Sequence, residues 1–365
     1  MRITINCRSI LKANPTGIGR YTNNLIRHLG AIDHSNQYCL YTPKGVFDFK
    51  RQLPVFAFSN FKQELDMFNR GIKDTDIYHL PSPDKIGHVA AKLVVTVHDL
   101  IHQAYPQGHT PETIDITEKH MQQIIKRADH VICTSNSTRT DLHRFYEFPK
   151  EKSSAILNGV DHTIFYQIKD KAEAQPLLIK LGVESGFILY VGTIEPRKNI
   201  QGVLEALAIL KAGKNKLPKL VVAGMRGWMM DQVHPLIKKL GLEGQVVFAG
   251  FLSDQELNML YNTCTLFIFP SFYEGFGFPI VEAFCAGACV ITSSTSSCAE
   301  IAGDAALLVD PSSKQAIASA IERVLADDGL KTMLKAKASN RAAAFSFAAT
   351  AAKTLDIYYV LQASS

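Results

Sequence analysis

The sequence lacks the features that would place it across a membrane or in an oxidising compartment. No apolar run reaches the ~20 residues that a spanning helix needs, and the chain starts with the strand-like segment Arg2–Asn6 rather than a secretory leader. Its 7 cysteines are odd in number and form no Cys-x-x-Cys pair. We therefore expect buried, reduced thiols and a cytoplasmic location.

Runs of charge of one sign are also missing. The 39 lysines and arginines exceed the 34 acidic residues by only 5, and they are spread along the chain. We therefore expect no nucleic-acid partner. Residues 44–70 alone interleave cations with many phenylalanines. A strand followed by an amphipathic helix explains this stretch, and so does a face for acidic lipid or for the acceptor, which leaves open a peripheral contact with the inner face of a membrane.

What the sequence does contain is enough apolar material for two domains. It has 365 residues, of which 47% are hydrophobic and 20% charged. Nearly all-apolar runs alternate with segments of helix length, which is the pattern of parallel sheets covered by helices on both faces. The predicted strands are Ile3–Asn6, Tyr38–Tyr41, Pro54–Phe58, Ile77–Leu80, Leu93–His98 and Val131–Ser135, then Phe187–Gly192, Leu220–Gly224, Val246–Gly250, Leu266–Pro270, Val290–Ser293 and Ala306–Asp310.

These two series predict two Rossmann-like, doubly wound domains. The polar stretch between them puts the boundary near residue 165, giving domains of residues 1–165 and 166–345. The Ala-rich residues 346–365 are expected to form a helix that can cross back to the first domain. Ligands of such sheets bind beyond the carboxyl ends of the strands, so the loops that follow each strand carry the candidate sites.

A glycine pair follows the first predicted strand, in the segment Thr16-Gly17-Ile18-Gly19-Arg20. The amides of Gly17 and Gly19 open a helix and are suited to a phosphate, although a plain tight turn explains them equally well. The segment is not the dinucleotide fingerprint, because Thr22 stands where the third glycine belongs.

His98 and Asp99 follow the fifth predicted strand, at the binding edge of the first sheet. With His102 they resemble a zinc signature, but that motif needs both histidines on one helix face, and His98 closes a strand. We therefore favour a histidine that contacts substrate over a structural histidine or a metal ligand.

Two cations, Arg197 and Lys198, lie in the segment Glu195-Pro196-Arg197-Lys198-Asn199 after the first strand of the second domain. Cations just before a helix do not favour its dipole, so an anionic ligand explains them better than stability does. The alternative is a solvated charge pair.

The most specific segment runs from Pro270 to Ala283 and carries Glu274 in a glycine-rich loop. Pro279 is expected to be the first helical residue, which puts Glu282 in the first helical turn. This spacing does not suit the paired carboxylates of a glycosidase. The amides of the loop residues are suited to an anion, namely those of Phe276, Gly277 and Phe278.

Glu274 and Glu282, with seven residues between them after a strand that ends in Pro-Ser, resemble the signature of family 4 retaining glycosyltransferases of the GT-B fold. The segments around Arg197, His98 and Gly17 and the segment Ala299–Asp304 follow in the family's order. The resemblance covers nearly the whole chain and is looser between residues 43 and 90. It implies two domains facing across a cleft, the first binding the acceptor and the second the nucleotide sugar.

The resemblance also implies a role for each matching residue. Arg197 and Lys198 would hold the diphosphate, Glu274 the sugar hydroxyls and Glu282 the ribose, while His98 would meet the transferred sugar. Further donor contacts would come from Gly17, Gly19, Ser135, Phe251, Leu252 and Glu300. The acceptor hydroxyl would attack from the face that the diphosphate leaves, with no nucleophile and no metal cofactor.

One departure from the family is Thr193, where many relatives carry an arginine. Charge stabilisation then rests more heavily on Arg197 and Lys198. The Glu-Pro-Arg-Lys-Asn variant resembles mannosyltransferases of lipid-linked or surface polysaccharides. We therefore expect GDP-mannose as the donor and a glycan or lipid-linked oligosaccharide as the acceptor, and no pattern indicates an oligomeric state.

Two other activities stay open at this point. A nucleotide-sugar epimerase on the same fold would convert the donor without an acceptor. A metal-dependent hydrolase would use His98 and His102 and would be sensitive to chelators.

Overall fold

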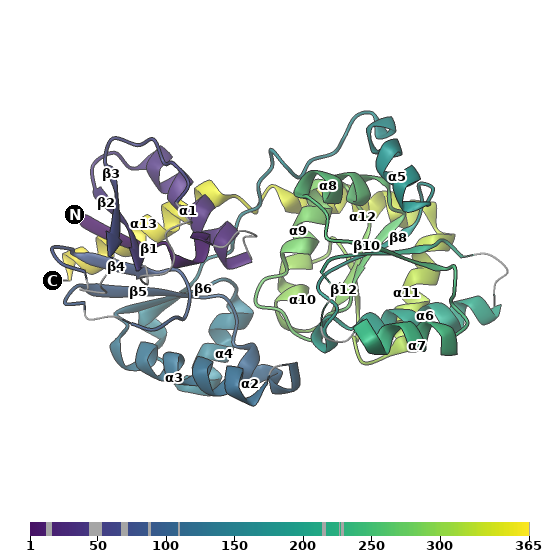
Figure 1. The fold of residues 1–365 in the computed structure, drawn as a ribbon, viewed down its shortest axis with the longest axis horizontal. Coiled ribbons are helices and arrows are strands. Elements are labelled where there is room, and N and C mark those ends of the chain that lie inside the picture. The colour runs from purple at the N-terminus through teal and green to yellow at the C-terminus, as the bar shows by residue number, and fades with distance from the viewer. Residues whose placement is uncertain are drawn as a thin grey trace. The chain divides into compact units, whose positions relative to one another are not determined.

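A computed structural model describes residues 1–11, 17–43, 53–66, 72–86, 89–108, 110–213, 217–225, 227 and 230–364. The chain divides into two compact units (Figure 1). Unit 1 comprises Met1–Gly159 and Ser346–Ser365, and unit 2 comprises Val160–Phe345. Thr16 and residues 44–52 and 67–70 lie outside the described residues, so the cationic and aromatic face considered for the 44–70 segment is described only in part.

Unit 1 is built on a parallel sheet with the strand order β3-β2-β1-β4-β5-β6-β7. The order reverses between β1 and β4, as in doubly wound folds. Its strands are β1 (Arg2–Asn6), β2 (Gln37–Pro43), β3 (Phe61–Asp66), β4 (Ile77–Leu80), β5 (Lys92–Val97), β6 (His130–Cys133) and β7 (Ser153–Ala155).

The strand predicted at Pro54–Phe58 is wrong. These residues form an irregular segment, and the edge strand is β3, which pairs with β2. Phe56 is buried, and the ring of Phe58 lies so close to Gly30 that a Cβ at Gly30 would be 2.3 Å from it. The apolar side chains of this segment therefore pack on a helix instead of forming a ladder.

Helices cover both faces of the unit 1 sheet. One face packs on α3 and α4 through the core residues of β4, β5 and β6. On the other side α1 lies against α13, the last helix of the chain (Figure 1). The helices are α1 (Gly17–Ile32), α2 (Ile101–Ala104), α3 (Pro111–Arg127), α4 (Asn136–Tyr146) and α13 (Phe347–Ala363), and the short 3-10 helices are η1 (Arg8–Leu11), η2 (Pro106–Gly108) and η3 (Lys150–Lys152).

A buried histidine fixes α13 to the unit 1 sheet. The Nδ1 atom of His79 on β4 is hydrogen-bonded to the hydroxyl of Tyr358, and its Nε2 atom lies 2.8 Å from Thr96 Oγ1. Burial, together with the nearby His98, lowers the pKa of His79 to about 3, so the ring is neutral. The last helix is thus held to the sheet by a specific polar contact.

Unit 2 repeats the same architecture with the strand order β10-β9-β8-β11-β12-β13. Its strands are β8 (Ile188–Val191), β9 (Leu220–Ala223), β10 (Val246–Gly250), β11 (Leu266–Phe269), β12 (Val290–Ser293) and β13 (Leu307–Val309). Its helices are η4 (Lys171–Ala174), α5 (Gln175–Leu181), η5 (Pro196–Lys198), α6 (Ile200–Gly213), α7 (Met230–Lys239), α8 (Asp254–Thr263), α9 (Phe278–Cys285), α10 (Ser296–Ala302), α11 (Lys314–Ala326) and α12 (Asp328–Ala342).

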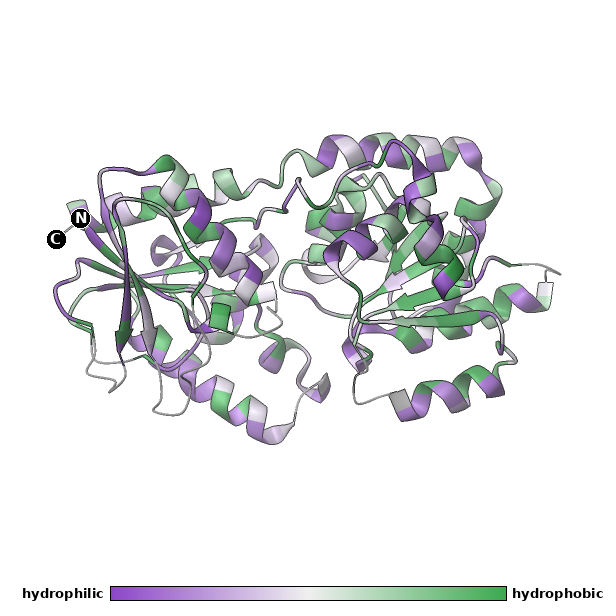
Figure 2. Ribbon diagram, turned by 45° about the horizontal axis from the view of Figure 1, so that its top comes forward, coloured by the Kyte–Doolittle hydropathy of each residue, from purple (hydrophilic) through white to green (hydrophobic). Residues whose placement is uncertain are grey.

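The hydropathy pattern follows this layering. Strands of the unit 2 sheet are largely hydrophobic in Figure 2, whereas the helices are banded with polar residues. The core joins β8, β9 and β11 to helices α6 and α11, as expected when a parallel sheet is covered on both faces. The structure confirms the predicted fold class of two parallel α/β domains.

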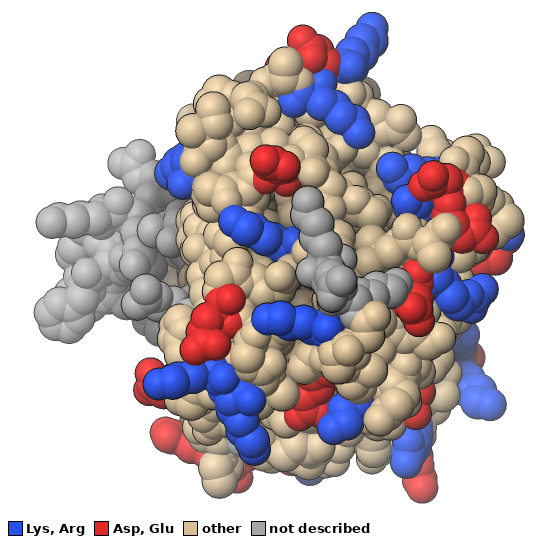
Figure 3. All heavy atoms as spheres, turned by 90° about the vertical axis from the view of Figure 1, so that its right-hand side faces the viewer, with Lys and Arg blue, Asp and Glu red and all other residues tan. Residues whose placement is uncertain are grey.

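Two surface properties bear on partners. Within the described residues, every helix is too short or too polar to cross a bilayer. On the end of unit 2 that Figure 3 shows, basic and acidic side chains are interspersed rather than gathered into one basic patch.

Candidate functional site

The most specific candidate residues lie together at the point of the unit 2 sheet where the strand order reverses. The strand order reverses between β8 and β11. Glu195–Asn199 follow β8 and Pro270–Gly277 follow β11, so the two loops lie side by side at the carboxyl edge of the sheet. This switch point is where open parallel sheets bind their ligands.

Hydrogen bonds to backbone carbonyls hold the two loops together. The carbonyl of Arg197 accepts from the N–H of Phe272 at 2.8 Å and from Ser271 Oγ at 3.0 Å. Asn199, in a left-handed conformation with φ 58°, donates from Nδ2 to the carbonyls of Pro270 and Pro311. The loop that carries the two cations is therefore rigidly placed.

Both cations contact Glu274. Lys198 Nζ lies 2.6 Å and Arg197 Nη1 2.7 Å from Glu274 Oε1. Arg197 also pairs with Glu195 through Nη2 and donates to the carbonyl of Tyr273 at 2.8 Å. The sequence showed the cations but not their partners, because Glu274 is 76 positions away from Lys198.

The charge of Glu274 is strongly stabilised. The residue is 8% exposed. Burial by itself would raise its pKa, but the charges of Arg197 and Lys198 and the hydrogen bonds from Lys198 and Ser271 outweigh burial and lower the pKa to about 2. Glu274 therefore stays ionised at neutral pH and is not a proton donor.

Two serines that sequence reasoning missed fix the backbone of Glu274. Its N–H donates to Ser296 Oγ at 3.1 Å, and its carbonyl accepts from Ser297 Oγ at 2.8 Å. Both serines begin α10, after β12. Ser296 has φ 54°, an uncommon conformation for a residue with a side chain. The only sign of these residues in the sequence was a pair of serines between a strand and the helix that follows it.

Glu282 is not in the first helical turn, which corrects the sequence prediction. Helix α9 begins at Phe278, one residue before Pro279, with Gly277 as its N-cap at φ 96°. Proline fits the second helical position as well as the first, because neither N–H has a partner within the helix. Glu282 is thus the fifth residue, where it is buried and accepts from the Tyr261 hydroxyl at 3.1 Å.

The remaining donor candidates of unit 2 are spread over three segments of the chain. Phe276 is buried against Phe278, at the start of α9. Phe251 is 64% exposed after β10, whereas Leu252 is buried. Glu300 lies in α10, and its carbonyl accepts from Arg341.

His98 belongs to unit 1 and is oriented by one hydrogen bond. Its Nε2 lies 2.8 Å from the carbonyl of Pro81, and its ring packs edge-on against Tyr21. Because a carbonyl only accepts, Nε2 carries the proton and Nδ1 is an acceptor. Burial lowers the pKa of His98 and outweighs the hydrogen bond to the Pro81 carbonyl and the charge of Asp99, both of which would raise it. The ring is therefore neutral at pH 7.

His102 has different partners from His98. Its Nε2 lies 2.8 Å from the hydroxyl of Tyr146, which donates to Glu118. The two histidines therefore do not share a site, contrary to what a zinc signature requires. Within the described part of the chain, no cluster of three or more histidine, cysteine or acidic side chains is arranged to hold a metal.

The other unit 1 candidates lie at helix starts. Gly17 is the first residue of α1, and Gly19 is buried in its first turn. Ser135 is fully buried as the N-cap of α4, where its hydroxyl accepts from the N–H of Thr138 at 3.0 Å. This capping role is a structural reason for Ser135, whatever else it contacts.

Comparison with known proteins assigns both halves of the chain. The family described as "Glycosyltransferase Family 4" matches residues 15–164, and "Glycosyl transferases group 1" matches residues 179–341. An O-antigen chain mannosyltransferase B of Escherichia coli is 28% identical over 95% of this chain and 96% of its own. The serotype-specific mannosyltransferase WbdA of Escherichia coli is 31% identical over 82% of this chain, which spans only 36% of WbdA.

Solved structures agree on the fold. Sucrose-phosphate synthase from Thermosynechococcus elongatus has a TM-score of 0.77 at 22% identity, with both chains fully covered. WaaG, a glycosyltransferase involved in lipopolysaccharide biosynthesis, has a TM-score of 0.73 at 17% identity, with 98% and 99% of the two chains covered. Together with the family matches, these findings confirm the family, the fold and the enzyme class predicted from sequence. The chain belongs to the family 4 retaining glycosyltransferases, which have the GT-B fold.

Proposed function

We propose that this enzyme transfers mannose from GDP-mannose to a hydroxyl of a glycan or of a lipid-linked oligosaccharide. The names of its relatives support the sugar, because both Escherichia coli relatives are mannosyltransferases and one of them acts on O-antigen chains. A hexose on a nucleoside diphosphate also suits the charges in unit 2.

One observation carries the proposal: two cations are held by a buried carboxylate at the switch point of unit 2. We assign the diphosphate to Arg197 and Lys198. Lys198 has three N–H donors, of which Glu274 takes one, so phosphate oxygens can accept from the others. The N–H of Phe278, the first residue of α9, has no carbonyl partner within the helix, so it can also donate to a phosphate oxygen.

The two glutamates take different parts of the donor. Glu274, beside the cations, is assigned to the sugar hydroxyls, and its fixed negative charge stabilises the positive charge that develops at the anomeric carbon. Glu282 is assigned to the ribose hydroxyls. Phe251, Leu252 and Glu300 are further donor contacts by resemblance to the family.

The unit 1 candidates complete the assignment. His98 is neutral with Nδ1 as an acceptor, which suits a hydrogen bond from a hydroxyl of the transferred sugar. Gly17 and Gly19 are assigned to the phosphates. In the reaction the acceptor oxygen bonds to the anomeric carbon on the face from which the diphosphate departs, and the acceptor proton passes to a diphosphate oxygen.

We further propose that no metal is required, because Arg197 and Lys198 supply the positive charge that a metal would bring to the leaving diphosphate. The test is transfer activity after exhaustive treatment with a chelator. Retained activity supports this proposal, and loss that only a divalent metal restores overturns it.

The experiment for the main proposal is a donor screen. Purified enzyme is incubated with each nucleotide sugar and with lipid-linked and free oligosaccharide acceptors, and products are identified by mass spectrometry. We expect GDP-mannose to give a mannosylated product. Lys198→Met should lower turnover about a hundred- to a thousandfold. Lys211→Met, at an exposed lysine in the last turn of α6, is the matched control and should keep activity.

A further inference from the structure

Unit 2 has a pocket at the edge of the sheet opposite to the candidate site. It measures about 390 Å³, within the range of small-molecule pockets, and lies between the segment before η4, the C-terminal ends of α8 and α9, and helix α12. Asn262 and Gly287 in its wall precede β11 and β12, whereas Glu274 follows β11. Because the strands are parallel, the two sites lie at opposite edges of the sheet.

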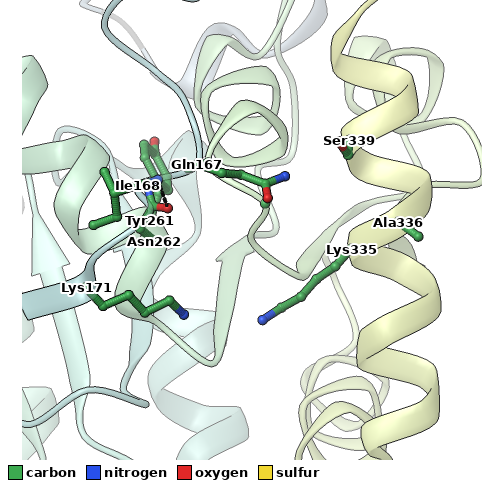
Figure 4. Close-up of a pocket in the computed structure, with 10 residues that line it drawn as sticks. Gln167, Ile168, Lys171, Tyr261, Asn262, Lys335, Ala336 and Ser339 are labelled. Carbon is green, nitrogen blue, oxygen red and sulfur yellow. Dashed lines mark hydrogen bonds between the residues drawn. The ribbon is translucent and has the colours of Figure 1, made fainter.

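Two lysines face each other across this pocket. Lys171 comes from η4 and Lys335 from α12, and Figure 4 shows their side chains extending toward one another from opposite walls. Among the described residues, neither has a carboxylate within ion-pair distance. Two ammonium groups that converge without a counter-ion repel each other, and an anion between them removes that repulsion.

The wall between the lysines is polar and fixed in place. Asn262, 6% exposed, donates to the carbonyl of Tyr166 and accepts from the N–H of Ile168, both at 2.9 Å, which fastens this segment to α8. The side chain of Gln167 lies over Gly287, where a Cβ would be 2.9 Å from its carboxamide carbon. Hydrogen bonds therefore hold this wall of the pocket in place.

We propose that this pocket binds a small, soluble, phosphate-bearing anion. Its volume fits a metabolite, its two ammonium groups suit phosphate oxygens, and Gln167 and Ser339 add polar groups at the rim. An apolar ligand would leave these groups unpaired, and a cation would be repelled.

A hydrogen bond connects the pocket to the candidate donor site. Tyr261 lines the pocket, and its hydroxyl donates to Glu282, the fifth residue of α9. An occupant that shifts Tyr261 therefore changes the hydrogen bonding of Glu282, and with it the affinity for the donor. This second part rests on the proposed function of Glu282.

The site is tested by lysine footprinting of the full-length enzyme with pyrophosphate as the probe. Labelling is measured by mass spectrometry, with a non-phosphate salt of equal ionic strength as the reference. At a probe concentration about ten times its Kd, labelling of Lys171 and Lys335 should fall about tenfold. Lys180, with 71% of its side chain exposed on α5, is the matched control and should not change.

In Lys335→Gln, protection of Lys171 should disappear. Unchanged labelling of Lys171 and Lys335 overturns the proposal, as does equal protection of Lys180. Protection only by vesicles of phosphatidylglycerol, and not by pyrophosphate, also overturns it, because the ligand would then be a lipid headgroup. Pyrophosphate bound at Arg197 cannot mimic the result, since that site is at the other edge of the sheet.

The link to the donor site is tested with the donor KM, measured with and without inorganic phosphate. Direct competition at the donor site raises the KM equally in every variant. The part of the KM increase that arises from phosphate in the pocket should be lost in the double variant Lys171→Gln/Lys335→Gln and in Tyr261→Phe. In Tyr261→Phe, pyrophosphate should still protect Lys171 and Lys335 from labelling. Protection without any difference in KM overturns the link and leaves the site, whereas absence of transfer from every donor overturns the proposed function alone.

Discussion

Replacing Glu274 with glutamine removes the one negative charge that both Arg197 and Lys198 contact, while keeping the shape of the side chain. In the folded chain the pKa of Glu274 is about 2, against an ordinary value of 4.5, because its two cations outweigh the effect of burial. This difference is equivalent to about 3 kcal/mol of folding free energy. Breaking a buried ion pair from one side costs about 3–5 kcal/mol, which is the same order.

The sign of the pH dependence follows from the lowered pKa. Stabilisation by ionised Glu274 is fully present above pH 4.5 and is lost as the pH falls toward 2, where the folded form also becomes protonated. Wild type should therefore lose this increment on acidification, whereas Glu274→Gln lacks it at every pH. The two stabilities should differ most near neutral pH and converge in acid.

The assay is urea denaturation of full-length wild type and Glu274→Gln at several pH values between 3 and 7, followed by circular dichroism. Glu195→Gln is the matched control, because Glu195 contacts only Arg197 of the two cations and should cost less. A loss under about 1 kcal/mol at pH 7, the range of an exposed pair, with a gap that does not narrow in acid, would refute the reasoning.

Four further substitutions have defined outcomes. Glu282→Ala should weaken binding of the nucleoside diphosphate, measured by calorimetry, with a smaller effect on turnover, because the ribose does not react. Glu274→Ala should lower turnover without weakening that binding. The reverse pattern would mean that the two roles are exchanged. His98→Ala should lower turnover more than donor affinity in steady-state kinetics, and an equal loss of nucleotide binding would contradict its assignment to the sugar. Tyr358→Phe should cost about 1–3 kcal/mol of unfolding free energy by leaving buried His79 Nδ1 without its partner, and a stability equal to wild type in urea would contradict that contact.

The sheets were predictable because their inner strands are nearly continuous apolar runs. Ile77–Leu80 was predicted with the bounds that β4 has in the structure. The prediction failed at the edge, where β3 (Phe61–Asp66) is mostly exposed and polar and the more apolar Pro54–Phe58 packs on a helix instead. Strand β7 (Ser153–Ala155) is too short for a periodic signal.

The candidate site was predictable in its residue types but not in its contacts. Arg197, Lys198 and Glu274 were singled out because they follow strands whose ends share one edge of the sheet. That both cations pair with Glu274 depends on which strands are neighbours, and sequence spacing does not show this. For the same reason Ser296, which comes from a third loop, escaped notice. The predicted position of Glu282 in α9 was wrong by one residue, because proline fits the first and the second helical position equally well and the sequence does not show which of them Pro279 takes.

The central claim is that this chain transfers mannose from GDP-mannose with retention at the anomeric carbon. The most direct measurement is proton and carbon NMR of the isolated product formed from GDP-mannose and an oligosaccharide acceptor. We expect a new α-mannosidic linkage, which has the configuration of the donor, and about a hundred- to a thousandfold slower formation of this product with Lys198→Met. A β-linkage, or release of free mannose without a glycoside when an acceptor is present, would contradict it.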